Sequence, residues 1–155
     1  MIKIIRKLFA YDEWAITCIV ASLKSMSNQN QKALRSLAHL LIAEKVWFLR
    51  MQGQNTSEIN LSPELSLTEC ESLANENQRA YADFFSSLNE EGLHSMVTYK
   101  NSKGTKFSTP VVDILTHVAL HGTYHRGQIA TALRGEGATP VNTDFITFVR
   151  EIDIS

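Results

Sequence analysis

The sequence predicts an all-α protein: a four-helix bundle with a small hairpin or loop before the last long helix. Apolar residues recur at helical spacing along most of the 155 residues. With only 7 Gly and 3 Pro, the chain has too few turn residues for many short strands. A composition of 44% apolar and 20% charged residues is typical of a chain that buries a core, and the length fits a single domain over residues 1–155.

The first two helices are predicted from apolar periodicity. Residues 2–24 place apolar side chains at i, i+3, i+4 and i+7. A polar break follows at 25–30, and its Ser and Asn residues are candidate N-caps. The second helix is expected from about 31 to 52, with Gly53 as a C-terminal signal.

A third helix is expected over about 67–89, after a loop at 53–66. Ser66 or Thr68 with Glu69 matches the pattern of a capping box. The long loop permits a crossover connection, so periodicity alone does not decide the direction of each helix.

The pattern then changes to a hairpin and a final long helix. Residues 96–100 and 105–108 alternate around a turn, as paired strands do. Pro110 is predicted at the first helical position, because a proline there has no N–H to leave unpaired. The fourth helix is expected over 110–134, closed by two glycines, and a short apolar stretch follows at 145–152.

Charge, hydropathy and cysteine content exclude several classes of protein. The net charge is −1, which argues against the clustered basic surface that nucleic-acid binding needs. No apolar run approaches the length of a membrane span, and the N-terminus does not resemble a secretory signal. Cys18 and Cys70 are far apart, with no C-x-x-C motif. We therefore expect a cytoplasmic protein with no nucleic-acid or membrane partner.

Three of the five histidines recur every four residues on the fourth helix: His117, His121 and His125. At 100° per residue, His125 lies about 20° and His121 about 60° from the direction of Val118, inside the apolar stripe. His117 lies about 100° away, on the flank of the stripe. Two imidazoles at i, i+4 can bind one ion, although hydrogen-bonded core histidines remain the alternative.

The remaining histidines are less informative. His39 lies on a helix that is apolar nearly all round, so helical phase does not decide where it points. His94 follows a glycine near a loop and is expected to be exposed. Gly122 stands where a zincin peptidase has its general-base Glu, which argues against that class. A glycine inside a helix instead permits close approach of another helix.

Asp12 is an acidic residue on an apolar stripe. It lies about 40° from Leu8 on the first helix, so its carboxylate needs a partner. One interpretation is a salt bridge or cap to a neighbouring helix, for which Arg126 is the obvious cation. The other is a catalytic role, either accepting the N–H of a metal-binding histidine or acting as general base for a bound water.

The last helix resembles a known family. Residues 117–130, HVALHGTYHRGQIA, resemble the last-helix signature of the DinB-like (DinB/YfiT-like) metalloenzymes. Residues 9–15 (FAYDEWA) are similar to the first helix of that family. Residues 38–40 (AHL) and 43–47 (AEKVW) are similar to its second. The resemblance covers nearly the whole chain, and H-x-x-x-H-R-G-Q is its most specific part.

The resemblance implies a four-helix bundle of up-down-down-up order. It also implies a divalent metal ion, nickel or zinc, held by one histidine of the second helix and two of the fourth. Carried over residue by residue, these ligands are His39, His121 and His125. Arg126 and Gln128 would be supporting residues.

The function that the resemblance implies is metal-dependent chemistry on a small molecule, in a protein that forms a homodimer. Some relatives transfer thiols such as bacillithiol, mycothiol or glutathione. The leading hypothesis is therefore a thiol transferase or a hydrolase, with Asp12 or a metal-bound water handling the proton. Neither cysteine is placed to be the nucleophile, so the thiol would be a low-molecular-weight cosubstrate. The alternatives are a non-catalytic, stress-related metal-binding bundle and a dimeric bundle without metal.

Overall fold

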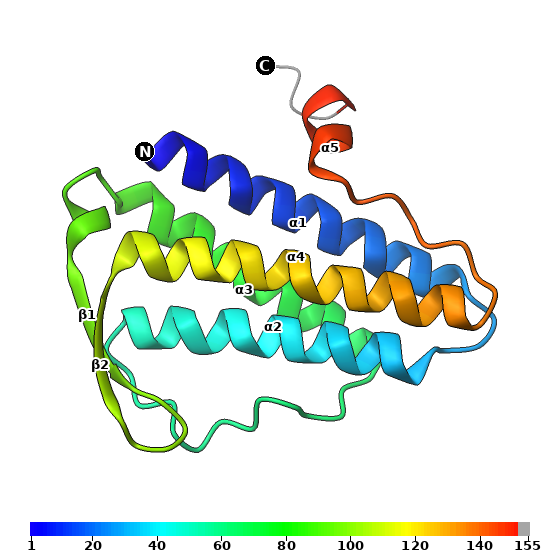
Figure 1. The fold of residues 1–155 in the computed structure, drawn as a ribbon, viewed down its shortest axis with the longest axis horizontal. Helices are drawn as coiled ribbons and strands as arrows, with labels where there is room; N and C mark the ends of the chain where they lie inside the picture. Colours follow the sequence, from blue (N-terminus) through cyan, green and yellow to red (C-terminus); the bar gives the residue numbers. More distant parts are fainter. Residues whose placement is uncertain (152–155) are drawn as a thin grey trace.

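The computed structural model describes residues 1–151 and is mostly helical, which confirms the all-α prediction (Figure 1). Four long helices lie side by side, and a short fifth follows: α1 (Ile2–Ser25), α2 (Gln31–Met51), α3 (Leu67–Ser87), α4 (Val111–Gly135) and α5 (Phe145–Glu151). Within the described part of the chain, no helix has the length and hydropathy needed to span a membrane.

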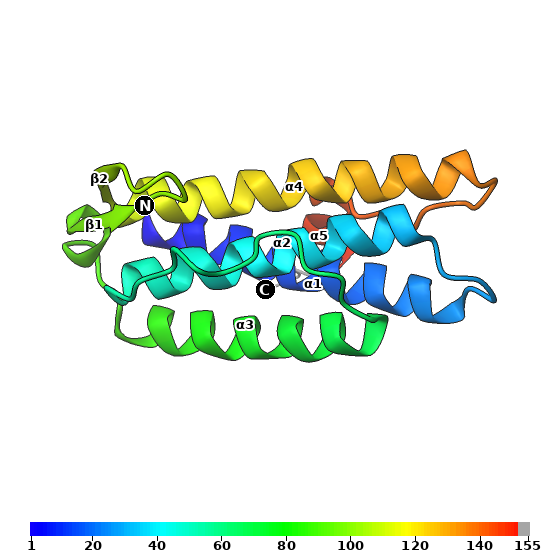
Figure 2. The ribbon, with the colours of Figure 1, turned by 90° about the horizontal axis from the view of Figure 1, so that it is seen from below.

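The long helices run in two directions. α1 and α4 run one way, and α2 and α3 run the other (Figures 1 and 2). Both α1 and α2 pack against α3 and α4. Because α2 and α3 run the same way, the connection at residues 52–66 returns along the length of the molecule (Figure 2).

Local hydrogen bonds explain where α2 and α3 begin. The Asn30 side chain accepts a hydrogen bond from the backbone N–H of Ala33, at 2.8 Å, and caps α2. Ser66, rather than Thr68, caps α3 in a complete capping box. Its hydroxyl accepts from the N–H of Glu69, whose carboxylate accepts from the N–H of Ser66 at 2.8 Å.

α3 ends two residues earlier than expected. The helix stops at Ser87, and Leu88 has an extended backbone with ψ 127°. The side chain of Asn89 then accepts a hydrogen bond from the N–H of Gly92 and starts the 3₁₀ turn Gly92–His94. This side-chain bond competes with the helical backbone bonds, as Asn residues commonly do.

The predicted hairpin is present, as the antiparallel pair β1 (Met96–Lys100) and β2 (Lys106–Pro110). The expected start of the last helix is wrong by one residue. Pro110 is the last residue of β2, and α4 begins at Val111. The N–H of Val111 donates to the carbonyl of Ser95 at 3.0 Å, so the strand pairing continues up to the helix.

Two glycines allow the turns that end the helices. Gly53 and Gly137 have φ of +72° and +79°, in the left-handed region that favours glycine. Gly135, expected to lie after α4, is instead its last residue. The predicted apolar stretch at the end of the chain forms α5 as far as Glu151, whereas residue 152 lies outside the described residues.

Buried polar side chains separate two apolar clusters of the core. One cluster lies near the α1–α2 turn and includes Leu23, Leu37, Leu40, Leu41, Ile129 and Leu133. The other lies near the hairpin and includes Ile5, Phe85, Leu93, Val111, Leu115 and Val118. Along each long helix, one buried polar residue stands between the two clusters: Asp12, Glu44, Asn77 and Arg126. We call these four residues the polar layer.

An ion pair joins α1 to α4 within the polar layer. Arg126, only 4% exposed, donates from Nη1 to Oδ1 of Asp12, which is 6% exposed. Its Nη2 donates to Thr123 Oγ1 at 2.9 Å, and its guanidinium lies 4.8 Å from the ring centre of Tyr11. A buried charge is tolerated only when it is paired and hydrogen-bonded in this way.

Glu44 and Asn77 complete the polar layer. Asn77 Nδ2 donates to Glu44 Oε2 at 3.0 Å and to the carbonyl of Leu41 at 2.8 Å. Burial raises the pKa of Glu44 well above its usual value, and the charge of Asp12 and a hydrogen bond with it raise that pKa further. Both effects favour the protonated form of Glu44, which hydrogen-bonds to Asp12.

Replacing two glycines of α4 by alanine is predicted to change the free energy of unfolding in opposite directions, because only one of them lies against the ion pair. A Cβ at Gly122 would lie 2.5 Å from Oδ1 of Asp12, whereas one at Gly127 would meet nothing within 4 Å. We expect Gly122→Ala to lower the free energy of unfolding by about 1–3 kcal/mol through overpacking. Gly127→Ala should raise it by up to about 1 kcal/mol, because Ala is the better helix former. Urea denaturation measures the free energy of unfolding of both variants. If Gly122→Ala stabilised the protein as much as Gly127→Ala does, the close approach of Asp12 to Gly122 would be contradicted.

Candidate metal centre

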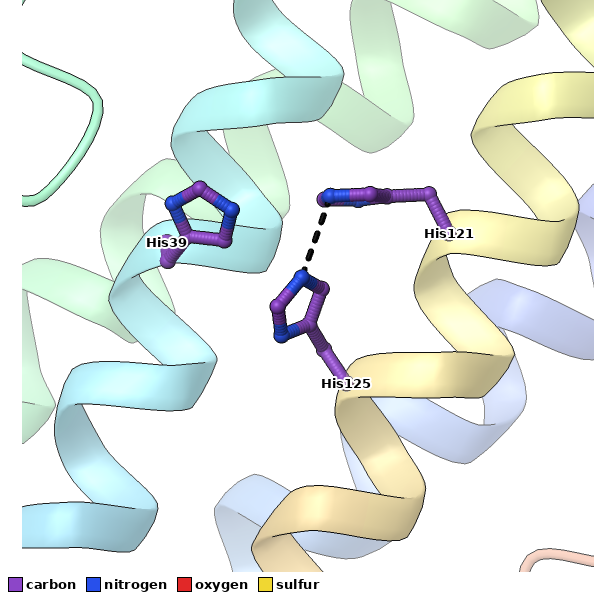
Figure 3. A group of neighbouring side chains, drawn as sticks. All are labelled: His39, His121 and His125. Carbon is purple, nitrogen blue, oxygen red and sulfur yellow. Dashed lines mark hydrogen bonds between the residues drawn. The ribbon is translucent and has the colours of Figure 1, made fainter.

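Three imidazoles from two helices converge between α2 and α4 (Figure 3). His39 comes from α2, and His121 and His125 come from α4. One nitrogen from each ring lies within 4.8 Å of the other two, and all three residues are half-buried. The structure thus turns His39 toward the other two, which helical phase had left undecided.

The orientation of α4 follows from the ion pair. Gly122 directly follows His121, and Arg126 directly follows His125. Each therefore lies about 100° round the helix axis from the histidine before it. Because Arg126 points toward Asp12 on α1, the neighbouring face that bears His121 and His125 is turned toward α2. The ion pair and the histidines therefore occupy adjacent faces of the same helix.

The nitrogen spacing fits a shared metal ion. Nε2 of His121 lies 3.1 Å from Nε2 of His125 (Figure 3). Two nitrogens bound to one zinc at about 2.0–2.1 Å, with tetrahedral angles, are roughly 3.3 Å apart. The rings are thus already close to the spacing that a common ion requires.

Hydrogen bonds hold two of the rings in the tautomer that a metal needs. Nδ1 of His39 donates to the carbonyl of Leu61 at 2.6 Å. Nδ1 of His125 lies 2.7 Å from Oε1 of Gln128, an acceptor. With Nδ1 donating, Nε2 is left with a free lone pair, as in most metal-binding histidines. The resemblance to the family had indicated Gln128 as a supporting residue. It had not indicated Leu61, because Leu61 orients His39 through its backbone carbonyl and a backbone carbonyl has no sequence signature.

Burial keeps the imidazoles of α4 uncharged. It lowers the pKa of His121 to about 4, with additional contributions from the charges of His125, His39 and His117. Burial also lowers the pKa of His125, although its hydrogen bond to Gln128 partly opposes this. Neutral imidazole is the form that binds metal ions, so both rings are ready to do so at neutral pH.

The other two histidines lie outside this group. His117 is exposed, with its ring centre 5.5 Å from that of His121 and 5.2 Å from that of Trp47, so it flanks the three histidines as expected. His94 is exposed in the turn before β1, also as expected.

The structure shows Asp12 in a salt bridge with Arg126, the cation that the sequence had indicated. Within residues 1–151, none of the hydrogen bonds of Asp12 leads to an imidazole. Its proposed role in proton transfer stays a prediction. Sequence reasoning missed the burial of Glu44 and Asn77, because neither residue belongs to a spacing motif. Glu44 also lies on α2, which is apolar nearly all round.

A helical fold in which one histidine of α2 meets an H-x-x-x-H pair on α4 defines a class of three-histidine helical proteins. The chain belongs to the DinB family, whose family model matches residues 12–152. It is similar to Protein DinB of Bacillus subtilis (strain 168), at 27% identity over 157 residues covering 90% of each chain. It is also similar to the uncharacterized protein YizA of the same organism, at 23% identity over 149 residues covering 90% of this chain and 92% of that protein.

The lowered pKa of His121 predicts how the stability of the metal-free protein depends on pH. In the unfolded chain this imidazole takes up a proton near pH 6.5, whereas in the folded protein it does so only near pH 4. The free energy of unfolding should therefore fall as the pH drops from 6.5 toward 4. Urea denaturation of chelator-treated protein at pH 7 and pH 5 measures this, and His121→Asn should reduce the difference. An undiminished difference in that variant would contradict the pKa shift.

Proposed function

We propose that this protein is a divalent-metal-dependent enzyme acting on a small molecule, with His39, His121 and His125 as the metal ligands. The observation that supports this most is the convergence of three imidazoles whose free nitrogens face one another. Three protein ligands are the usual number in a catalytic zinc site, where the remaining position takes water or substrate. An all-imidazole set suits zinc and nickel.

The proposed reaction is transfer of a low-molecular-weight thiol to an electrophile, or hydrolysis. When bound, the ion would lower the pKa of a coordinated thiol or water toward neutral pH. The thiol is proposed as a cosubstrate because the protein's own thiols are poor nucleophiles. Burial raises the pKa of Cys70 to about 11, and it also raises the pKa of Cys18.

The residues of the chain would hold and orient the reacting groups. Leu61 and Gln128 fix the rings of His39 and His125 through their Nδ1 atoms. Arg126 holds α4 against α1, and we propose Asp12 as the group that accepts or returns a proton. Its hydrogen bond with Glu44 supports this, because burial and the charge of Asp12 raise the pKa of Glu44 and favour a proton between the two carboxyl groups.

The proposal includes the organisation of the whole chain. Residues 1–155 would form one domain, an up-down-down-up four-helix bundle that assembles as a homodimer in the cytoplasm. The directions and contacts of the long helices support this bundle order. The balanced charge supports the absence of a nucleic-acid partner, and the hydropathy of the sequence supports the absence of a membrane partner.

Metal analysis tests the ligand set. Wild-type protein loaded with zinc or nickel and then dialysed should retain about one ion per chain, because three neutral imidazoles converge. His39→Ala, His121→Ala and His125→Ala should each retain far less, whereas His94→Ala, at an exposed site in a turn, should match the wild type. Equal metal content in all five proteins, measured by mass spectrometry of the elements, would refute the assignment.

A rate measurement tests the reaction. Metal-loaded protein should accelerate conjugation of glutathione, bacillithiol or mycothiol with chlorodinitrobenzene, and the acceleration should disappear in the His39→Ala variant. A parallel assay with nitrophenyl esters tests hydrolysis. Stoichiometric metal binding with no acceleration of any of these reactions would favour the non-catalytic metal-binding alternative.

A further inference from the structure

Arg50 is a half-buried cation without an acidic partner, near the end of α2, where that helix and the start of α4 meet the hairpin (Figure 1). Its Nε donates to Oγ1 of Thr56 at 3.1 Å. Among residues 1–151, no carboxylate forms a salt bridge with Arg50, and its Nη1 and Nη2 atoms donate no hydrogen bond. Burial lowers the pKa of Arg50, because its charge is partly removed from water, although a guanidinium stays protonated at neutral pH. An anion that accepts hydrogen bonds from both Nη atoms would offset this loss of hydration.

Two aromatic rings hold the guanidinium in place. Cζ of Arg50 lies 4.6 Å from the ring centre of Trp47 and 5.1 Å from that of Tyr99 on β1. The two rings also contact each other, with their centres 5.1 Å apart. Cation–π attraction orients the guanidinium but leaves its positive charge unneutralised. Because Thr56 occupies Nε, the two Nη groups are the part of Arg50 that is left to bind a ligand.

A line of ring contacts joins this cation to the candidate metal centre. The ring centre of His117 lies 5.5 Å from that of His121 and 5.2 Å from that of Trp47, the ring that Arg50 covers. α2 and α4 run in opposite directions (Figure 1). Trp47, about two turns after His39, and His117, about one turn before His121, therefore lie on the same side of the three histidines. His117 is exposed, so this line of contacts is open to solvent.

The connection at residues 52–66 positions both ends of this line. Its buried Thr56 holds Arg50, and the carbonyl of its Leu61 holds the ring of His39. One segment of the chain thus sets the position of a cation relative to a ring of the candidate metal centre.

We propose that Arg50 binds a carboxylate group of the small-molecule substrate, at the end away from the group that reacts at the metal centre. A guanidinium fits a carboxylate because two N–H groups donate to two oxygens in one plane, and one positive charge balances one negative charge. Trp47 and His117 would pack against the part of the substrate between its two ends. This inference rests on the proposed function for the position of the reacting end, and it adds an acidic class of substrate.

Fluorescence titration tests the carboxylate site with a matched pair of ligands, 6-mercaptohexanoate and 6-mercaptohexanol. The chain has two tryptophans, so a Trp14→Phe background leaves Trp47, which contacts Arg50, as the reporter. Zinc-loaded protein should bind the acid about tenfold more tightly than the alcohol, because hydrogen bonds to charged groups are the stronger ones. Arg50→Met should remove this preference, whereas Arg79→Met, at an exposed position on α3, should preserve it.

The same titration after chelation of the metal separates this inference from the proposed function. Metal-free protein should bind both ligands more weakly and keep its preference for the acid. A preference for the acid in either form of the protein that Arg50→Met removes supports the carboxylate site. If the metal added nothing to the binding of either ligand, the proposed function would fail while such a preference would still support the carboxylate site.

Two results would overturn the carboxylate site. One is equal affinity for acid and alcohol in both forms of the protein. The other is an undiminished preference in Arg50→Met, with circular dichroism confirming that the variant is folded. Arg50→Gln, a second uncharged variant, should behave in the same way and replaces Arg50→Met if that variant does not fold.

Discussion

The polar layer is the constraint on which the rest of the structure depends. Each long helix places one polar residue at the middle of the molecule, between two apolar clusters. Removing one partner of a buried ion pair such as Asp12–Arg126 costs about 3–5 kcal/mol, so the helices pack where these partners meet. Gly122 belongs to the same constraint, because only a residue without a Cβ leaves room for the ion pair.

The candidate metal centre follows from this packing. With Arg126 directed at α1, His121 and His125 face α2, where His39 completes the group. The long connection between α2 and α3 supplies the carbonyl of Leu61, so a segment without regular structure helps to orient a ring of the site. The polar layer also separates two different environments: imidazoles between α2 and α4, and a cavity between α1 and α3 that is lined by apolar and charged side chains.

Local features were predicted well because they depend on residues close in the chain. The cap at Asn30, the capping box at Ser66 and the hairpin all appear where the sequence indicates them. Two of the boundary errors, at the end of α3 and at Pro110, arise where one local hydrogen bond replaces another. After α3, the side chain of Asn89 accepts a hydrogen bond from the N–H of Gly92 and starts a turn, so the helix does not continue. Before α4, the N–H of Val111 donates to the carbonyl of Ser95, so the strand pairing extends to the first residue of the helix.

The sequence by itself determined the helical class, the positions of the helices and the pairing of His121 with His125. These properties depend on periodicity and on the fixed angle between residues of one helix. Only the tertiary structure decided which way His39 faces, that Asp12 forms a salt bridge, and that Glu44 and Asn77 lie buried beside that salt bridge. The physical reason is that spacing relates side chains within a helix but does not fix the rotation of that helix against its neighbours. On α2, which is apolar nearly all round, that rotation is set by packing and by the polar layer.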